Sequence, residues 1–126
     1  MKTHKDLDAW KGSIAMVTEI YKQTICFPKH ETYGLTNQIR RAAVSVPANI
    51  SEGAARINSR EFRHYLRISL GSLNELETLL IISLRLDYIT QSVFESIFER
   101  IILLTAQISG LIKAMDRKII NQQALK

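Results

Sequence analysis

The sequence has few of the residues that interrupt helices or build covalent and metal sites. Its 126 residues include five glycines, two prolines and one cysteine, Cys26. So few glycines and prolines disfavour a sandwich or barrel of many short strands, because those folds need frequent turns. A single cysteine excludes an internal disulfide and a thiolate metal cage. Long helices are therefore the expected structure.

Long apolar runs and a secretory leader are also lacking. The longest uncharged stretch, 101–112, is well below the roughly 20 apolar residues of a membrane span. The first eleven residues are polar and charged, unlike a signal peptide. Apolar residues make up 46% of the chain and charged residues 23%, a balance typical of a folded globular protein. We expect one soluble, cytoplasmic domain over residues 1–126, with no membrane partner.

Apolar residues recur at spacings of three and four along four segments of the chain. This periodicity predicts amphipathic helices at about 8–25, 35–56, 59–86 and 91–120. Asn58 and Thr90 stand where the third and fourth helices would need N-caps. Four amphipathic helices joined by short loops predict an all-α, up-down-up-down four-helix bundle.

The third and fourth segments carry more apolar residues than one buried stripe needs. The surplus residues are Leu79, Ile82, Leu86, Phe94, Phe98 and Ile102. Either the core is wide, or these side chains form a subunit interface, which we favour because monomers rarely leave such surface in water. A homo-oligomer follows from the second alternative. Gly71 and Gly110 lie inside long helices, where each costs roughly 1 kcal/mol relative to alanine, so we expect close helix packing at both.

The sequence contains no recognisable catalytic motif. It has neither a Gly-x-Ser-x-Gly elbow nor a glycine-rich phosphate loop. Glu61-x-x-His64 has the spacing used in di-iron bundles, but those bundles need a second such pair and two further carboxylates. A nuclease or metal protein using Glu61 and His64 is therefore the least favoured alternative. We expect no enzymatic activity, no catalytic residue, no metal and no cofactor.

Positive charge is concentrated in one part of the chain. Seventeen Lys and Arg against twelve Asp and Glu give a net charge of +5, and six arginines and two glutamates between Arg40 and Arg67 account for +4 of it. The planar fork of arginine can hold phosphate oxygens bidentately. The candidate nucleic-acid-binding residues are Arg40, Arg41, Arg56, Arg60, Arg63, His64 and Arg67.

The same arginines have an alternative use in ion pairs. Within the second helix, Glu52 could pair with Arg56 four residues later. Between subunits, the arginines could face carboxylates such as Glu75, Glu77, Glu95 or Glu99. Two hypotheses remain open on this evidence from charge: a nucleic-acid-binding scaffold and a protein-interaction scaffold without nucleic-acid binding.

Two stretches of the sequence resemble a known family. The longer is 27–53, with the core Gln38-x-Arg40-Arg41-Ala42-x-x-Ser45-x-Pro47-x-Asn49-x-x-Glu52-Gly53, and the shorter is Gly71-Ser72-Leu73-Asn74-Glu75-Leu76-Glu77. Both are similar to the four-helix-bundle proteins encoded within intervening sequences of bacterial 23S ribosomal RNA genes. The resemblance implies a left-handed up-down bundle that assembles into a homopentameric ring without known catalysis.

A related branch of that family adds expectations about partners. The accessory variability proteins of diversity-generating retroelements are similar in fold and bind nucleic acid and a reverse transcriptase through basic surfaces. The resemblance thus implies RNA or DNA as one partner and a protein such as a reverse transcriptase as another. Together with the arginines, it predicts a non-catalytic oligomeric scaffold that binds nucleic acid largely through phosphates.

Overall fold

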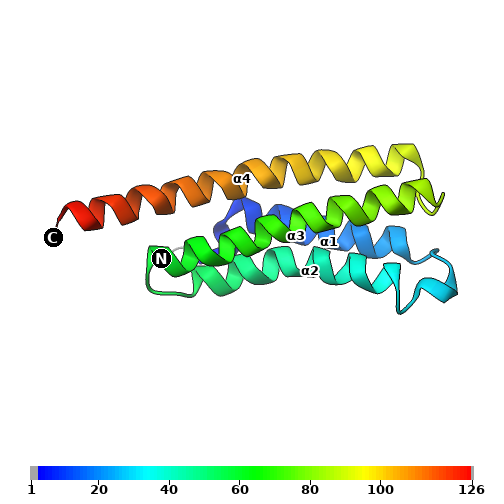
Figure 1. The fold of residues 1–126 in the computed structure, drawn as a ribbon, viewed down its shortest axis with the longest axis horizontal. Helices are drawn as coiled ribbons and strands as arrows, with labels where there is room; N and C mark the ends of the chain where they lie inside the picture. Colours follow the sequence, from blue (N-terminus) through cyan, green and yellow to red (C-terminus); the bar gives the residue numbers. More distant parts are fainter. Residues whose placement is uncertain (1–2, 126) are drawn as a thin grey trace.

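Four α-helices make up almost all of the chain. The structure, a computed structural model, describes residues 3–125 (Figure 1). Its helices are α1 (Asp8–Thr24), α2 (Leu35–Ala54), α3 (Ser59–Arg85) and α4 (Gln91–Ala124), with 3-10 turns at His4–Asp6 and Lys29–Glu31. Over the described residues there is no strand, which confirms the predicted all-α class. The predicted helix boundaries hold to within two residues, except that α4 continues past residue 120 to Ala124.

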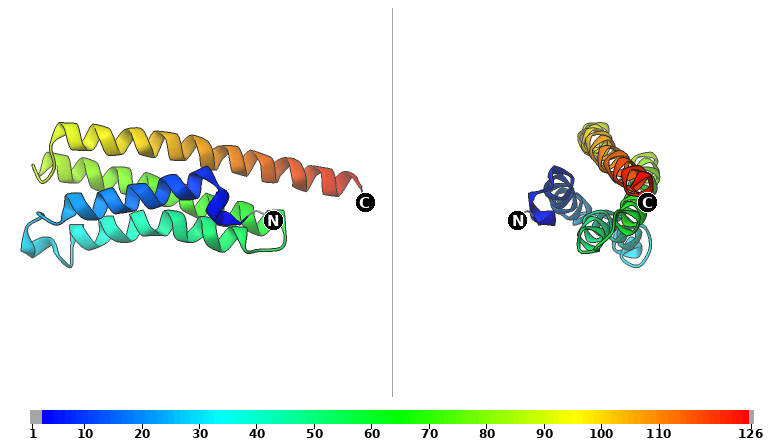
Figure 2. Two further views of the ribbon diagram at one scale, coloured as in Figure 1. Left: turned by 180° about the vertical axis from the view of Figure 1, so that it is seen from behind. Right: turned by 90° about the vertical axis from the view of Figure 1, so that its left-hand side faces the viewer.

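The helices form the predicted four-helix bundle. Each helix packs on its neighbours in the chain, and α1 closes the bundle against α4, as the end-on view in Figure 2 shows. Consecutive helices run in opposite directions, so the topology is up-down-up-down. α4 is the longest helix, with 34 residues, and its C-terminal end extends beyond the other three (Figure 1).

Side chains at the helix starts explain why α3 and α4 begin where they do. Asn58 Oδ1 accepts a hydrogen bond from the Glu61 amide at 2.9 Å, and Thr90 Oγ1 accepts one from the Val93 amide at 3.2 Å. Each bond satisfies a first-turn N–H that has no partner within the helix. Both predicted N-caps are confirmed.

One apolar core runs along the bundle axis and draws on every helix. Its fully buried side chains include Met16 and Ile20 of α1, with Ile39, Ile50, Leu66, Leu73, Leu76, Leu104 and Ile108 from the other helices. A buried hydroxyl among them is satisfied across the helix contact, because Ser69 of α3 donates to the Val46 carbonyl of α2 at 2.9 Å. α2 continues through the buried Pro47 as one helix.

Close helix contact occurs at Gly53 and not at Gly71 or Gly110. A Cβ atom added at Gly53 would lie 2.7 Å from Tyr65 Cβ and 2.9 Å from Phe62 Cδ1, so α2 approaches α3 closely there. At Gly71 and Gly110 an added Cβ would meet nothing within 4 Å. The prediction of close packing at these two glycines within the chain is wrong, because both lie on outward-facing sides of their helices.

The two loops at one end of the bundle are joined by Tyr88. Its hydroxyl donates to Glu31 Oε2 at 3.0 Å, and its ring packs on Phe27 with 5.3 Å between centroids. The other carboxylate oxygen of Glu31 accepts from the Leu35 amide at 3.2 Å and so caps α2. Desolvation, followed by the hydrogen bond to Glu31, raises the pKa of Tyr88 above its ordinary value.

None of the helices over residues 3–125 is both long and apolar enough to cross a membrane.

Candidate nucleic-acid interface

An ion pair connects α3 and α4 near one end of the bundle. Arg63 Nη1 of α3 donates to Asp116 Oδ1 of α4 at 2.7 Å, and both side chains are partly buried. Because the two helices are antiparallel, the first half of α3 lies beside the last half of α4, and the pair connects them there. Arg63 is thus partly engaged in holding the bundle together.

Exposed basic residues surround this ion pair on both helices. Arg60, His64 and Arg67 lie within one turn of Arg63, and all three are exposed. On α4, the exposed Lys113 and Arg117 lie within one turn of Asp116. We call these five residues the basic surface: Arg60, His64, Arg67, Lys113 and Arg117.

Sequence reasoning missed the contribution of α4 to this surface. Lys113 and Arg117 have the i, i+4 spacing that places two side chains on the same helix face. In an antiparallel helical hairpin, the start of the first helix lies beside the end of the second. The spacing of Lys113 and Arg117 could therefore have indicated that α4 adds positive charge beside the start of α3. Among residues 3–125, Arg60, Arg67, Lys113 and Arg117 have no ion-pair partner within 4.0 Å.

Arg56 lies near the basic surface but is occupied by local contacts. Its guanidinium pairs with Glu52, donates to Tyr65 Oη at 3.0 Å and lies over the Tyr65 ring at 5.2 Å. Tyr65 and then Glu52 raise the pKa of Arg56, so it keeps its charge. The predicted ion pair between Glu52 and Arg56 is confirmed. Two of the six candidate arginines, Arg56 and Arg63, therefore have ion-pair partners among the described residues.

Arg40 and Arg41 are not brought to the basic surface. The Arg40 side chain turns toward α1, where it stacks on Tyr21 and donates to Thr24. Arg41 lines a hollow with Glu75 of α3, and Glu75 follows Arg60 by 15 residues, about 22 Å along the helix axis. The seven candidate residues thus form two groups in space: Arg40 and Arg41 on the first half of α2, and the other five around the start of α3.

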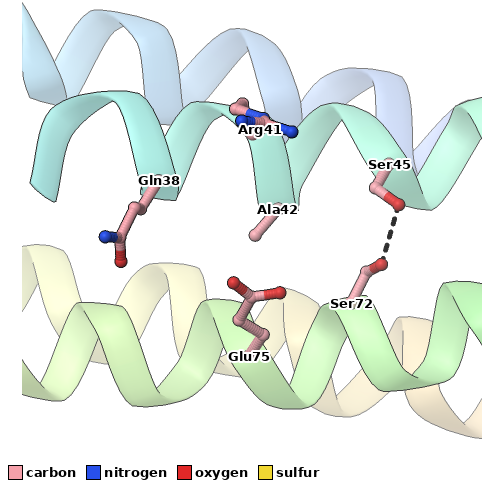
Figure 3. A pocket seen from close by; sticks show the side chains of 6 residues that line it. All are labelled: Gln38, Arg41, Ala42, Ser45, Ser72 and Glu75. Atoms are coloured by element: carbon pink, nitrogen blue, oxygen red, sulfur yellow. Dashed lines mark hydrogen bonds between the residues drawn. The ribbon is translucent and has the colours of Figure 1, made fainter. Parts of the chain in front are cut away.

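Both family-like stretches of the sequence meet at this hollow between α2 and α3. Gln38, Ala42 and Ser45 of α2 point toward Ser72 and Glu75 of α3, whereas the Arg41 side chain lies over α2 itself (Figure 3). The hollow has a volume of about 370 Å³, and Ser72 Oγ donates to Ser45 Oγ at 2.8 Å across it. Ser45 and Ser72, one from each stretch, therefore connect α2 and α3 at this level.

The surplus apolar residues do not form one uniform surface. Leu79 is only 6% exposed and belongs to the core, so for this residue the wide-core alternative holds. Phe94 packs against the core and stacks on Phe98 with 5.7 Å between ring centroids. The remaining three candidates are exposed: Ile82 by 41%, Leu86 by 49% and Ile102 by 55%.

The residues of the di-iron-like fragment do not converge on a metal site. In the part of the chain that the structure describes, no three or more His, Cys, Asp or Glu side chains are grouped to hold an ion. Glu61 instead takes part in the start of α3, where Asn58 Nδ2 donates to its carboxylate at 3.4 Å.

The fold and its surface define an up-down four-helix bundle with a basic surface at one end. The chain belongs to the 23S rRNA-intervening sequence protein family, whose sequence model matches residues 5–110. A similar solved structure is a protein of unknown function from the S23 ribosomal protein family of Bacteroides thetaiotaomicron VPI-5482. It has a TM-score of 0.75 and 27% sequence identity, covering 83% of this chain and 98% of that one. No curated protein matches the sequence.

Proposed function

We propose that the protein is a non-catalytic homo-oligomeric scaffold that binds RNA or DNA phosphates through its basic surface. The observation that carries the proposal is the exposure of Arg60, Arg67, Lys113 and Arg117 on neighbouring helices at one level of the bundle. Cations without intramolecular ion-pair partners can displace counterions from a nucleic-acid backbone, which is the main source of sequence-independent affinity. The family resemblance supports a pentamer as the assembly.

An oligomer would make a small basic surface effective. Each copy offers four permanently charged groups, too few for tight binding at physiological salt when used alone. Several copies bound to one strand act together, because the first contact raises the effective concentration of the others. We expect affinity to vary little with sequence and to fall with salt, with a slope of about −0.7 to −0.9 per neutralised phosphate.

Reversing two exposed arginines tests this proposal. The Arg60→Glu/Arg67→Glu double variant should lose gel-shift binding to single-stranded RNA and duplex DNA. Its helix content and its mass in light scattering should stay unchanged, because both side chains are exposed. Arg63 is left in place, since a glutamate there would remove the ion pair with Asp116 and put two like charges near each other.

A matched reversal separates specific binding from general charge attraction. Lys11 and Lys22 are exposed cations of α1, outside the basic surface, so Lys11→Glu/Lys22→Glu changes the net charge by the same amount. This control should keep most of the binding. Equal loss in both double variants, or no loss in the first, would contradict the proposed site.

The alternative function is a protein-interaction scaffold whose arginines form ion pairs. The pairs Arg56–Glu52 and Arg63–Asp116 favour it, as do the exposed carboxylates Glu75, Glu95 and Glu99 on α3 and α4. A protein partner such as a reverse transcriptase rests on the family resemblance alone. Under this alternative, Arg60→Glu/Arg67→Glu would change the oligomeric mass, and the wild type would show no salt-dependent binding to nucleic acid.

A further inference from the structure

A second basic feature lies in the outer groove between α1 and α2, away from the basic surface. A hollow of about 490 Å³ is lined there by Tyr21, Asn37, Arg40, Arg41, Val44 and Ser45. Two of these six residues are arginines, and none is a carboxylate. The hollow therefore gathers positive charge in a concave place where the lining supplies no counter-charge.

The guanidinium of Arg40 is held in one orientation by α1. It lies over the Tyr21 ring at 4.5 Å, Nε donates to Thr24 Oγ1 at 2.9 Å, and Nη2 points to the Tyr21 carbonyl oxygen at 3.5 Å. The buried Thr24 hydroxyl donates its own hydrogen to the Ile20 carbonyl at 2.8 Å, so its oxygen is available to accept from Arg40. Nη1 of Arg40 is left without a partner among the described residues.

Further hydrogen-bond donors border the same hollow. Arg41 is exposed and makes no ion pair within residues 3–125. Asn37, one turn before Arg41 on α2, is exposed as well and adds an amide. Positive charge that the lining leaves without a counter-charge favours an anion in the hollow, and a planar guanidinium fork matches the oxygens of a phosphate.

We propose that this hollow binds the phosphate group of a phosphate ester, held by Arg40 and Arg41. The half-exposed Tyr21 and Val44 form an apolar wall against which the organic part of the ester can lie. The phosphate belongs either to a small phosphate ester or to the 5′-phosphorylated end of a nucleic-acid strand, which present the same chemical group. The site does not depend on the basic surface, from which it is separate along the bundle.

Calorimetric titration of the full chain tests the site directly. The probes are inorganic phosphate, a nucleoside 5′-monophosphate and the same nucleoside without its phosphate. We expect inorganic phosphate and the monophosphate to bind and compete with each other, with the monophosphate tighter and the nucleoside silent. Absence of heat from both phosphate probes, or equal binding of nucleoside and monophosphate, would overturn the proposal.

Variants distinguish an oriented site from simple charge attraction. Arg41→Gln removes an exposed side chain with no structural contact, and it should weaken phosphate binding about tenfold or more, as expected for a charged hydrogen bond. Thr24→Val keeps every charge but releases Arg40 Nε, so it should weaken binding about threefold. Arg100→Gln, an equal charge change on α4, should have no effect. Equal weakening by Arg41→Gln and Arg100→Gln would overturn the site.

A carboxylate across the α2–α3 hollow offers a gain-of-binding test. Arg41 also borders that hollow, which Glu75 lines from α3 without forming an ion pair to any of residues 3–125 (Figure 3). Glu75→Gln removes a negative charge that competes for Arg41, so phosphate binding should tighten. Weaker binding in Glu75→Gln would contradict the assignment of Arg41 as a ligand.

The remaining comparisons separate this site from the proposed nucleic-acid surface. Arg60→Glu/Arg67→Glu should keep binding to the monophosphate even where it loses binding to nucleic acid, and loss of both would assign the phosphate to the basic surface instead. Oligonucleotides with and without a 5′-phosphate identify the source of the group. If the protein prefers the phosphorylated strand and Arg41→Gln removes this preference, the ligand is a strand end. If both strands bind equally while the monophosphate still binds, the ligand is a small phosphate ester.

Discussion

The two ends of the α3–α4 pair share one core but differ on their outer faces. At the end that holds Arg63 and Asp116, the exposed charged residues are mainly basic, as in Arg60, Arg67 and Lys113. At the end that holds the α3–α4 loop, two exposed arginines, Arg85 and Arg100, stand among carboxylates and apolar side chains that include Glu75, Glu95, Glu99, Ile82, Leu86 and Ile102. The buried stripe passes through both ends without a break. The core therefore specifies the bundle, and the outer faces of its two ends are free to serve different functions, ligand binding at one end and subunit assembly at the other.

This division assigns different tasks to the two ends. A basic, hydrated face suits a nucleic-acid backbone, because phosphate contacts need charge and little apolar burial. An apolar face is better buried against another copy of the chain, since exposed apolar patches favour association. We infer that assembly uses the loop end and leaves the basic end open.

The largest expected effect is on assembly, through one exposed residue at the loop end. Ile102 is 55% exposed, so Ile102→Asp should leave the core intact. Within a subunit interface, the new charge would be buried without a partner at a cost of several kcal/mol. Light scattering at micromolar concentration should therefore change from an oligomeric mass to that of a monomer, while circular dichroism retains its helical signal.

The neighbouring residue provides the control for this prediction. Leu103 is 58% exposed and points about 100° away around the same helix. Leu103→Asp should leave the oligomer unchanged if the interface follows Phe98 and Ile102. A wild type that is already monomeric would refute assembly at the loop end altogether.

The second prediction contrasts two glycines at different levels of α2 and α3. Gly53→Ala should destabilise the fold by about 1–3 kcal/mol, because its Cβ would lie 2.7 Å from Tyr65 Cβ and force the helices apart. Gly71→Ala, where the new Cβ meets open space, should stabilise α3 by up to about 1 kcal/mol. Urea unfolding of both variants measures the two changes. Dissociation of an oligomer by Gly71→Ala would instead place Gly71 in contact with another copy.

Sequence periodicity was sufficient to locate the helices, but it did not predict which residues meet on the surface of the bundle. Apolar spacing and the caps Asn58 and Thr90 located four helices because both are local signals. The pair Arg63–Asp116 joins residues 53 positions apart, and its register depends on how α3 and α4 pack. Leu79 lay off the main stripe on a helical wheel, but the bundle interior is wide enough to bury it. The faces presented by Gly71 and Gly110 likewise depend on packing.

A third prediction concerns the carboxylate inside the basic end. Asp116→Asn breaks the ion pair with Arg63, and because both side chains are partly exposed the loss of stability should be less than about 1 kcal/mol. The released Arg63 can then contact a phosphate. Affinity for nucleic acid should rise, and the salt slope should steepen by up to about 0.9. Glu99→Gln, the same charge change at the loop end, should leave the slope unchanged.

The smallest expected effect is a pH dependence at the loop end, through Tyr88. Desolvation and then Glu31 raise the pKa of Tyr88 in the folded state, because its neutral hydroxyl donates to the carboxylate at 3.0 Å. A raised pKa contributes stability that is complete below the ordinary value near 10 and is lost as pH rises through the folded value. Tyr88→Phe should thus be less stable than wild type at pH 8, with a gap that narrows by pH 11. Urea unfolding at both pH values measures the gap, with Tyr33→Phe as an exposed control. A gap that stays constant with pH would show that the Tyr88 hydroxyl contributes nothing through its ionisation.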